Sequence, residues 1–131
     1  MVRALGLILV LLFAAMPREA HASARELVGQ CQTLLHGKHG SGEQIRIPFT
    51  KPALTCWGYM QAVQDFTALA DEKGQRVLGI CPPDRATMLD IVRAFVRYAD
   101  ARGKDLPDNG ALAVTQALQS AYPCAGVAQR L

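Results

Sequence analysis

Four cysteines constrain the possible folds of this chain more than any other feature of its sequence. They are Cys31, Cys56, Cys81 and Cys124, with spacings of 25, 25 and 43 residues. An even number of widely spaced cysteines in a small exported protein is typical of disulfides. Zinc sites usually bring ligands in close pairs such as C-x2-C, and haem attachment uses C-x-x-C-H; neither pattern occurs in the chain. We therefore expect two disulfides and no metal or haem site.

The first 22 residues have the pattern of a cleavable secretory signal. Arg3 supplies a positive charge, the apolar run ALGLILVLLFAA follows it, and Ala20-His21-Ala22 places small residues at the −3 and −1 positions. The apolar run is shorter than the roughly 20 residues that a membrane-spanning helix needs. We expect cleavage after Ala22 and a soluble exported protein made of residues 23–131.

Length and charge limit what those 109 residues (131 − 22) can do. They are enough for a single domain. Without Arg3, Arg18 and Glu19 they hold 12 basic and 10 acidic side chains, and no run of like charges. Nucleic-acid binding needs a denser basic face, so we expect no nucleic-acid partner.

Four segments have the apolar spacing of amphipathic helices, and none alternates like a strand. We expect helices at about 24–37, 51–72, 88–103 and 111–122. Pro52 suits a first helical turn, Thr87 and Asp90 resemble a capping box, and Gly103 suits a helix end. The prediction is an all-α fold: a small, disulfide-stapled four-helix bundle with one long loop, residues 37–52, between the first two helices.

The same periodicity predicts which side chains face the core. In the second helix these are Cys56, Met60, Val63, Phe66 and Ala70, broadened by Leu54, Trp57 and Leu69; in the fourth they are Leu112, Val114, Leu118 and Ala121. Short helices joined by loops pair best with their neighbours. This favours the disulfides Cys31–Cys56 and Cys81–Cys124, although the two other pairings stay possible.

Candidate chemical groups are few. Trp57 and Tyr59 could stack on a ligand, but such a pair on an amphipathic helix is more often part of a core or an interface. Asp65 has no second carboxylate at a fixed helical offset, and His36 and His39 by themselves make a weak metal site. The chain has no G-x-S-x-G, H-E-x-x-H, Walker or Rossmann pattern. We expect a binding or inhibitory protein, not an enzyme, with no cofactor and no metal.

An ordered set of motifs adds a family resemblance. The export pattern is followed by a cysteine in the first helix, then by CWGYMQAVQD, by CPP just before a Thr-capped helix, and by ALQSAYPC. Together they resemble the Tai-type immunity proteins, which protect bacteria against amidase effectors of type VI secretion. The resemblance implies a periplasmic, helical homodimer that occludes the active-site cleft of a cysteine-peptidase-like peptidoglycan amidase and performs no reaction itself.

Within this resemblance the motif residues are structural: Trp57, Gly58, Tyr59, Asp65, Pro82, Pro83 and Pro123. We expect Gly58 to let another helix approach closely, and Tyr59 to pack with its hydroxyl hydrogen-bonded.

The expected effector contact is the 102–110 loop, RGKDLPDNG, between the third and fourth helices. It offers polar groups and one small apolar anchor: Lys104, Asp105, Asp108 and Asn109, with Leu106. Loops vary without disturbing a core, so they often carry recognition. An ordinary helix connection is the alternative.

The 37–52 segment looks longer than the corresponding link in the family. Ile45, Ile47 and Phe49 could form a second contact surface there. Deleting residues 38–47 should leave folding intact and change the oligomeric state or the partner; if neither changes, the segment is a passive loop.

Two other functions remain open. The main rival is a periplasmic helical chaperone that opens in acid, which exposure of dye-binding apolar surface at about pH 3 would favour. An enzyme would need a free thiol, which titration of the denatured chain would detect.

Overall fold

The computed structural model describes residues 22–37 and 47–125, and in them the fold is all-α. The helices are α2 (Ala24–Leu35), α3 (Lys51–Thr67), α4 (Met88–Arg102) and α5 (Gly110–Ala121), with the short 3-10 helix η1 (Gly103–Asp105) after α4. No strand occurs in the described ranges, where extended pairing is limited to isolated bridges. The predicted helical bundle is confirmed.

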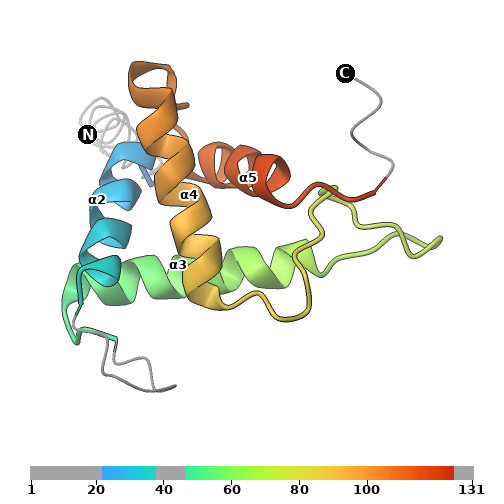
Figure 1. Cartoon of the computed structure of the whole chain (residues 1–131), viewed down its shortest axis with the longest axis horizontal. Helices are drawn as coiled ribbons and strands as arrows, with labels where there is room; N and C mark the ends of the chain where they lie inside the picture. The colour runs from blue at the N-terminus through green and yellow to red at the C-terminus, as the bar shows by residue number, and fades with distance from the viewer. Residues whose placement is uncertain (1–21, 38–46, 126–131) are drawn as a thin grey trace, which may run out of the picture.

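Helix α4 lies at the centre of the bundle and contacts each of the other three (Figure 1). It contributes more buried side chains than any other helix, and Ile91, Val92 and Phe95 are fully buried. Helices α2 and α3 form the other large contact, on one side of α4. Because burial of apolar surface is the main favourable term in folding, α4 is the element around which the domain is built.

The predicted capping box begins α4. The Thr87 hydroxyl accepts a hydrogen bond from the Asp90 amide at 3.3 Å, and the Asp90 carboxylate accepts one from the Thr87 amide at 2.9 Å. The backbone bond from Thr87 holds the pKa of the Asp90 carboxyl below its usual value. At the other end Gly103 has φ 55°, a conformation that favours glycine, so the helix ends where the sequence predicts.

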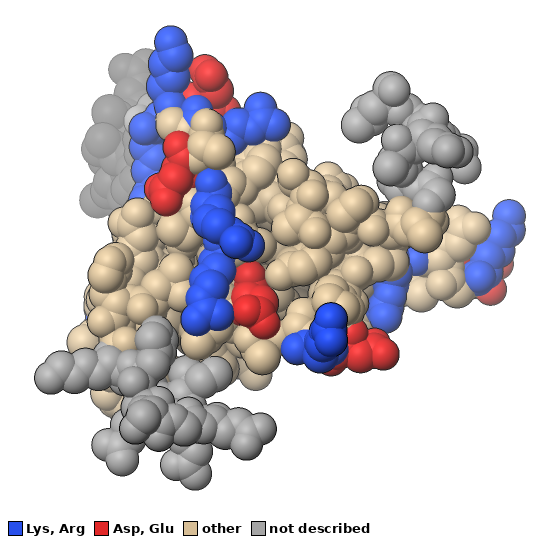
Figure 2. Space-filling model, in the orientation of Figure 1, with Lys and Arg blue, Asp and Glu red and all other residues tan. Residues whose placement is uncertain are grey.

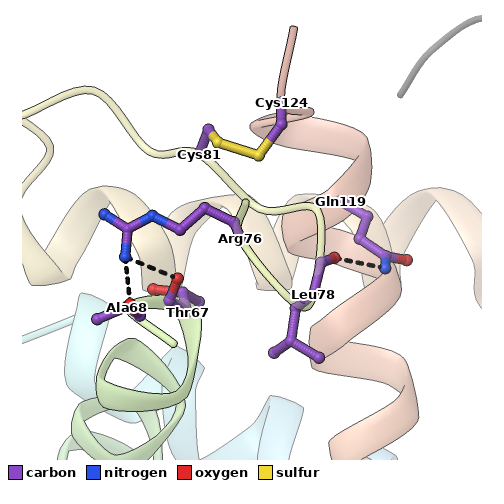
Figure 3. Close-up of a disulfide and its surroundings, with 7 residues drawn as sticks. All are labelled: Thr67, Ala68, Arg76, Leu78, Cys81, Gln119 and Cys124. Atoms are coloured by element: carbon purple, nitrogen blue, oxygen red, sulfur yellow. Dashed lines mark hydrogen bonds between the residues drawn. A yellow bond between two sulfur atoms is a disulfide. The ribbon is translucent and has the colours of Figure 1, made fainter. Parts of the chain in front are cut away.

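Helix α3 ends at Thr67, about five residues before the predicted end near Glu72. The Asp71 carboxylate accepts hydrogen bonds from two amides of a turn, those of Lys73 and Gln75. That turn brings Arg76 back to the helix, where its guanidinium donates to the carbonyls of Thr67 and Ala68 (Figure 3). A side chain remote in sequence thus caps the helix, which a local pattern does not reveal.

Part of the predicted core face of α3 is wrong, and for Leu69 and Ala70 the reason is the early end of the helix. Phe66, Leu69 and Ala70 are exposed, as is Leu54 in the first turn, while Thr67 takes a buried position instead. In α5, Leu112 and Ala121 are also exposed although both were expected inside. The other predicted core positions in these two helices are buried or half-buried.

The two disulfides pair Cys31 with Cys56 and Cys81 with Cys124, as the sequence favours. Cys31–Cys56 joins α2 to α3 with both cysteines fully buried. Cys81–Cys124 ties the connector before α4 to the end of α5, and Cys81 is exposed (Figure 3).

Backbone hydrogen bonds reinforce the second disulfide. The Cys81 amide donates to the Tyr122 carbonyl at 2.8 Å, and the Cys124 amide donates to the Gly79 carbonyl at 3.1 Å. The Pro82-Pro83 pair then leads into α4, and Pro123 pairs with Ile80 in an isolated bridge. The connector is therefore held both covalently and by hydrogen bonds.

Among the helices of the described residues, none is long and apolar enough to cross a membrane.

Candidate partner-binding surface

The 102–110 loop lies at the end of the molecule where α4 stops and where α2 and α5 begin (Figure 1, top). It consists of the last residue of α4, η1 and a short extended stretch that leads into α5. The C-terminal end of α4 and the N-terminal ends of α2 and α5 therefore lie around this loop.

Backbone hydrogen bonds tie the loop to the start of α2. The Ala24 amide donates to the Asp108 carbonyl at 2.8 Å, and the Gly110 amide donates to the Ala22 carbonyl at 2.9 Å. Ser23 and Asn109 form an isolated antiparallel bridge between these two bonds. We call residues 22–24 together with residues 108–110 the N-terminal junction. It fixes the C-terminal half of the loop.

Leu106, predicted as a small apolar anchor for a partner, is part of the core. Its side chain is 7% exposed and belongs to the main hydrophobic cluster. The sequence shows a single leucine among charged residues, prolines and glycines, and it cannot show that this side chain joins the core beside residues of α2 and α4. Leu106 anchors the loop to its own domain.

The polar residues of the loop divide into two groups. Lys104, Asp105 and Asp108 have exposed side chains. Asn109 is exposed but engaged, because its side-chain oxygen accepts a hydrogen bond from the Leu112 amide at 3.0 Å and caps α5. The first three are therefore the side chains that are free for a partner on this loop.

A shallow groove of about 190 Å³ adjoins the loop. Val28, Ala99 and Leu106 give it an apolar lining, and Arg25 and Asp100 contribute opposite charges. Figure 2 shows basic and acidic side chains close together over this end of the molecule. The loop and groove together offer a mixed-charge rim around a small apolar depression, which suits a protein partner better than a polyanion.

The sequence from residue 23 to residue 124 matches the model of the Rap1a immunity proteins. The chain belongs to the Rap1a immunity protein family. This is a family of type VI immunity proteins, so the predicted immunity role is confirmed at that level, and the partner of the chain is a toxin effector. No curated protein and no solved structure gives a significant match to the chain.

The CWGYM motif of this Rap1a family member is a packing element in α3. Trp57 and Tyr59 are half-buried against the core, and Asp65 is exposed. Burial raises the pKa of the Tyr59 hydroxyl, which has no hydrogen-bond partner among the described residues. The expected hydrogen bond of this hydroxyl is therefore absent from that part of the chain. Tyr59 instead lies next to Gly110, because a Cβ on that glycine would come 3.4 Å from the hydroxyl oxygen.

No helix of the described residues approaches Gly58 closely, so the predicted close packing at this glycine is not found within that part of the chain. Gly58 is exposed, and an added Cβ would meet nothing within 4 Å. In the sequence, a glycine between two bulky residues suggests a close contact between helices. Here Gly58 lies on the exposed side of α3.

An exposed apolar cluster near the end of α3 was missed by sequence reasoning, which placed two of its members in the core. Phe66, Leu69 and Val77 are 59%, 52% and 62% exposed. The Val77 amide donates to the Leu69 carbonyl at 3.0 Å, so the turn after α3 brings two of them together. Only the position of the turn, which depends on Asp71 and Arg76, could have revealed them.

The predicted second contact surface is only partly described. Phe49 is 93% exposed, whereas Ile47 packs against the core, so Ile47 is not the free contact residue that was expected. Ile45 and His39 lie outside the described residues. His36 ends α2, with its Nδ1 2.6 Å from the Gln32 carbonyl. No group of metal ligands occurs in residues 22–37 and 47–125.

Proposed function

We propose that this Rap1a family protein is exported to the periplasm, where it binds a peptidoglycan amidase effector of type VI secretion and occludes its active-site cleft without catalysing a reaction. Residues 1–22 are removed in this proposal, and residues 23–131 form the working protein. The family match supports the immunity role. The amidase class rests on the motif resemblance, from CWGYMQAVQD to SAYPC.

The cysteines support the proposed compartment. All four are joined in disulfides. Disulfides persist in oxidising places such as the bacterial periplasm and are rare in the reducing cytosol. An enzyme that cuts peptidoglycan acts in the periplasm, so its inhibitor must meet it there. The export pattern of residues 1–22 agrees with this compartment.

The observation that carries the proposal is the presentation of exposed charged side chains on a fixed loop. Lys104, Asp105 and Asp108 are exposed, while Leu106 below them is buried. The Ala24 amide, which stays in the chain that starts at Ser23, holds the loop through its hydrogen bond to the Asp108 carbonyl. A loop that is already ordered loses little conformational entropy on binding, so more of its contact energy appears as affinity. Such a loop suits insertion into an enzyme cleft, and the adjoining groove can receive a side chain of the effector.

We also propose a homodimer, which the resemblance implies. The molar mass of residues 23–131 in solution, measured by light scattering after size exclusion, tests this point. A monomer at all concentrations would remove the dimer from the proposal and leave the inhibitory role in place.

The direct test is capture and inhibition. Residues 23–131 are mixed with each amidase-like effector of the same organism, and binding and peptidoglycan hydrolysis are measured. We expect stoichiometric capture and loss of hydrolysis with one of them. Capture of an effector with a different activity would keep the immunity role and overturn the amidase assignment.

A matched pair of charge swaps tests the surface. The double variant Lys104→Glu/Asp105→Lys alters the loop, and Glu72→Lys/Lys73→Glu makes the same exchange in the turn after α3; all four side chains are exposed. Both keep the net charge, so nonspecific electrostatics change little. We expect about a tenfold or greater loss of affinity for the loop swap, since its charges are desolvated in the complex, and none for the other. Equal effects of the two swaps would rule out the loop as the contact surface.

If the folded protein captures none of these effectors, the proposal is refuted. The acid-opened chaperone would then be examined by dye binding at about pH 3.

A further inference from the structure

Asn109 is the only asparagine in the chain, and it is followed by Gly110. In an Asn–Gly pair the glycine amide nitrogen can attack the asparagine side-chain carbon, because no Cβ on the glycine blocks the approach. This attack starts deamidation. The pair lies in the N-terminal junction, so its chemistry bears on the part of the loop that the junction fixes.

While Ala22 is present, close packing requires glycine at position 110. Gly110 is buried, and a Cβ on it would come 2.8 Å from the Ala22 carbonyl oxygen and 3.4 Å from the Tyr59 hydroxyl. Its φ is not positive, so backbone conformation is not the reason. The approach of the chain before α2 to the start of α5 therefore creates a labile dipeptide at this site.

Hydrogen bonds restrain both reacting groups, one in the N-terminal junction and one in the first turn of α5. The Gly110 amide, which must act as the nucleophile, donates a hydrogen bond to the Ala22 carbonyl at 2.9 Å. The Asn109 side-chain oxygen accepts from the Leu112 amide at 3.0 Å, so the side chain is turned toward the first turn of α5. The extended backbone of Asn109, with φ −76° and ψ 120°, is held by the bridge to Ser23. Attack requires these restraints to open.

We propose that Asn109 is a deamidation site that the N-terminal junction holds in check, and that loss of the hydrogen bond between the Gly110 amide and the Ala22 carbonyl releases it. The Gly110 nitrogen forms a bond to Asn109 Cγ and loses its proton, and the side-chain amide nitrogen leaves as ammonia. Water then opens the succinimide ring at one of its two carbonyls. The product is aspartate or isoaspartate, with no oxidant or reductant involved.

The two products act differently on the loop. Aspartate still accepts a hydrogen bond at the start of α5, where a negative charge is favourable. Isoaspartate adds a methylene to the backbone, which moves Gly110 away from Ala22 and disturbs the N-terminal junction. The consequence for effector binding rests on the proposed function; the modification itself does not.

Removal of the first 22 residues would take away the Ala22 carbonyl. The protein that starts at Ser23 keeps the helix cap of Asn109 and loses the acceptor for the Gly110 amide. Deamidation at Asn109 should therefore be faster in that form than in one that retains Ala22.

The test compares a form that starts at Ala22 with a form that starts at Ser23, each checked by mass for removal of its initiator methionine. Both are incubated folded, and in concentrated urea, at mildly alkaline pH. Conversion of the amide to an acid is followed by intact mass and assigned by peptide mapping. The variant Asn109→Asp is the control for the assignment, since it should show no further conversion at this position.

We expect the folded Ala22 form to deamidate about tenfold or more slowly than in urea, because attack needs local opening. We expect the folded Ser23 form to react roughly fivefold faster than the folded Ala22 form, the factor that one ordinary hydrogen bond contributes. Equal rates in the folded Ala22 form and in urea would overturn the protection. Equal rates in the two folded forms would overturn the role of Ala22. Neither rate comparison needs an effector, so its result is independent of the proposed function.

Discussion

Replacing Leu106 with alanine tests whether this residue anchors the loop to the core. The substitution removes three carbon atoms from a side chain that is 7% exposed. At roughly 0.8 kcal/mol for each buried carbon group, the lost transfer free energy is about 2.4 kcal/mol. Leu106 borders a groove, so water can enter the space left behind, and we add no further term for an empty cavity.

Leu112 provides the matched control, because it is a leucine near the loop with 49% of its surface exposed. Leu112→Ala keeps the backbone amide that bonds to Asn109 and should lower the free energy of unfolding by at most about 1 kcal/mol. Urea unfolding of both variants, followed by circular dichroism, gives the two changes directly. If the two variants lose the same free energy, Leu106 is not a core residue and the reasoning about the loop fails.

Three further predictions concern features away from the loop. Mild reduction with a dithiol should open Cys81–Cys124 before the other disulfide, whose cysteines are fully buried, and alkylation with peptide mapping identifies the first thiols released; release of the buried pair first would contradict this. Asp90→Asn should lower stability by roughly 0.5 to 1 kcal/mol at neutral pH. The pKa of Asp90 is depressed in the folded state, so its contribution is lost as the pH falls through that pKa, and the unfolding curves of variant and parent should converge in strong acid. Gly58→Ala should stabilise the protein by about 0.5 to 1 kcal/mol, since the added methyl group enters open space in a helix; a lower melting temperature would show that the space is filled.

The helices and the α4 cap were predictable because their signals are local. Thr87 and Asp90 stand three residues apart and form their capping box within one turn. Gly103 ends the same helix because its backbone adopts a positive φ. Apolar spacing likewise located four helices, since a helix in a small domain must bury one face.

The errors came from contacts that lie outside the helical repeat. Periodicity continued α3 through Leu69 and Ala70, but the guanidinium of Arg76 binds the carbonyls at the end of the helix and the chain turns away. The sequence neighbours of Leu106 are polar, but its side chain belongs to the main hydrophobic cluster, beside a groove that residues of α2 and α4 also line. Neither contact has a local signature, so neither could be read from the chain.

The placement of the disulfides gives the two ends of the bundle different kinds of stability. Cys31–Cys56 bridges α2 to α3, and Cys81–Cys124 bridges the connector to the end of α5. Cys81–Cys124 encloses the 102–110 loop in sequence, but neither disulfide has a cysteine in that loop. A disulfide stabilises chiefly by limiting the unfolded chain, whereas the loop keeps its shape through the buried Leu106 and the hydrogen bonds of the N-terminal junction. Contacts of that kind can shift slightly when a partner binds, without breaking a covalent bond. The surface proposed to meet the effector is thus ordered enough to limit the entropy lost on binding. It is also the end of the domain whose shape a local modification, such as deamidation of Asn109, can alter.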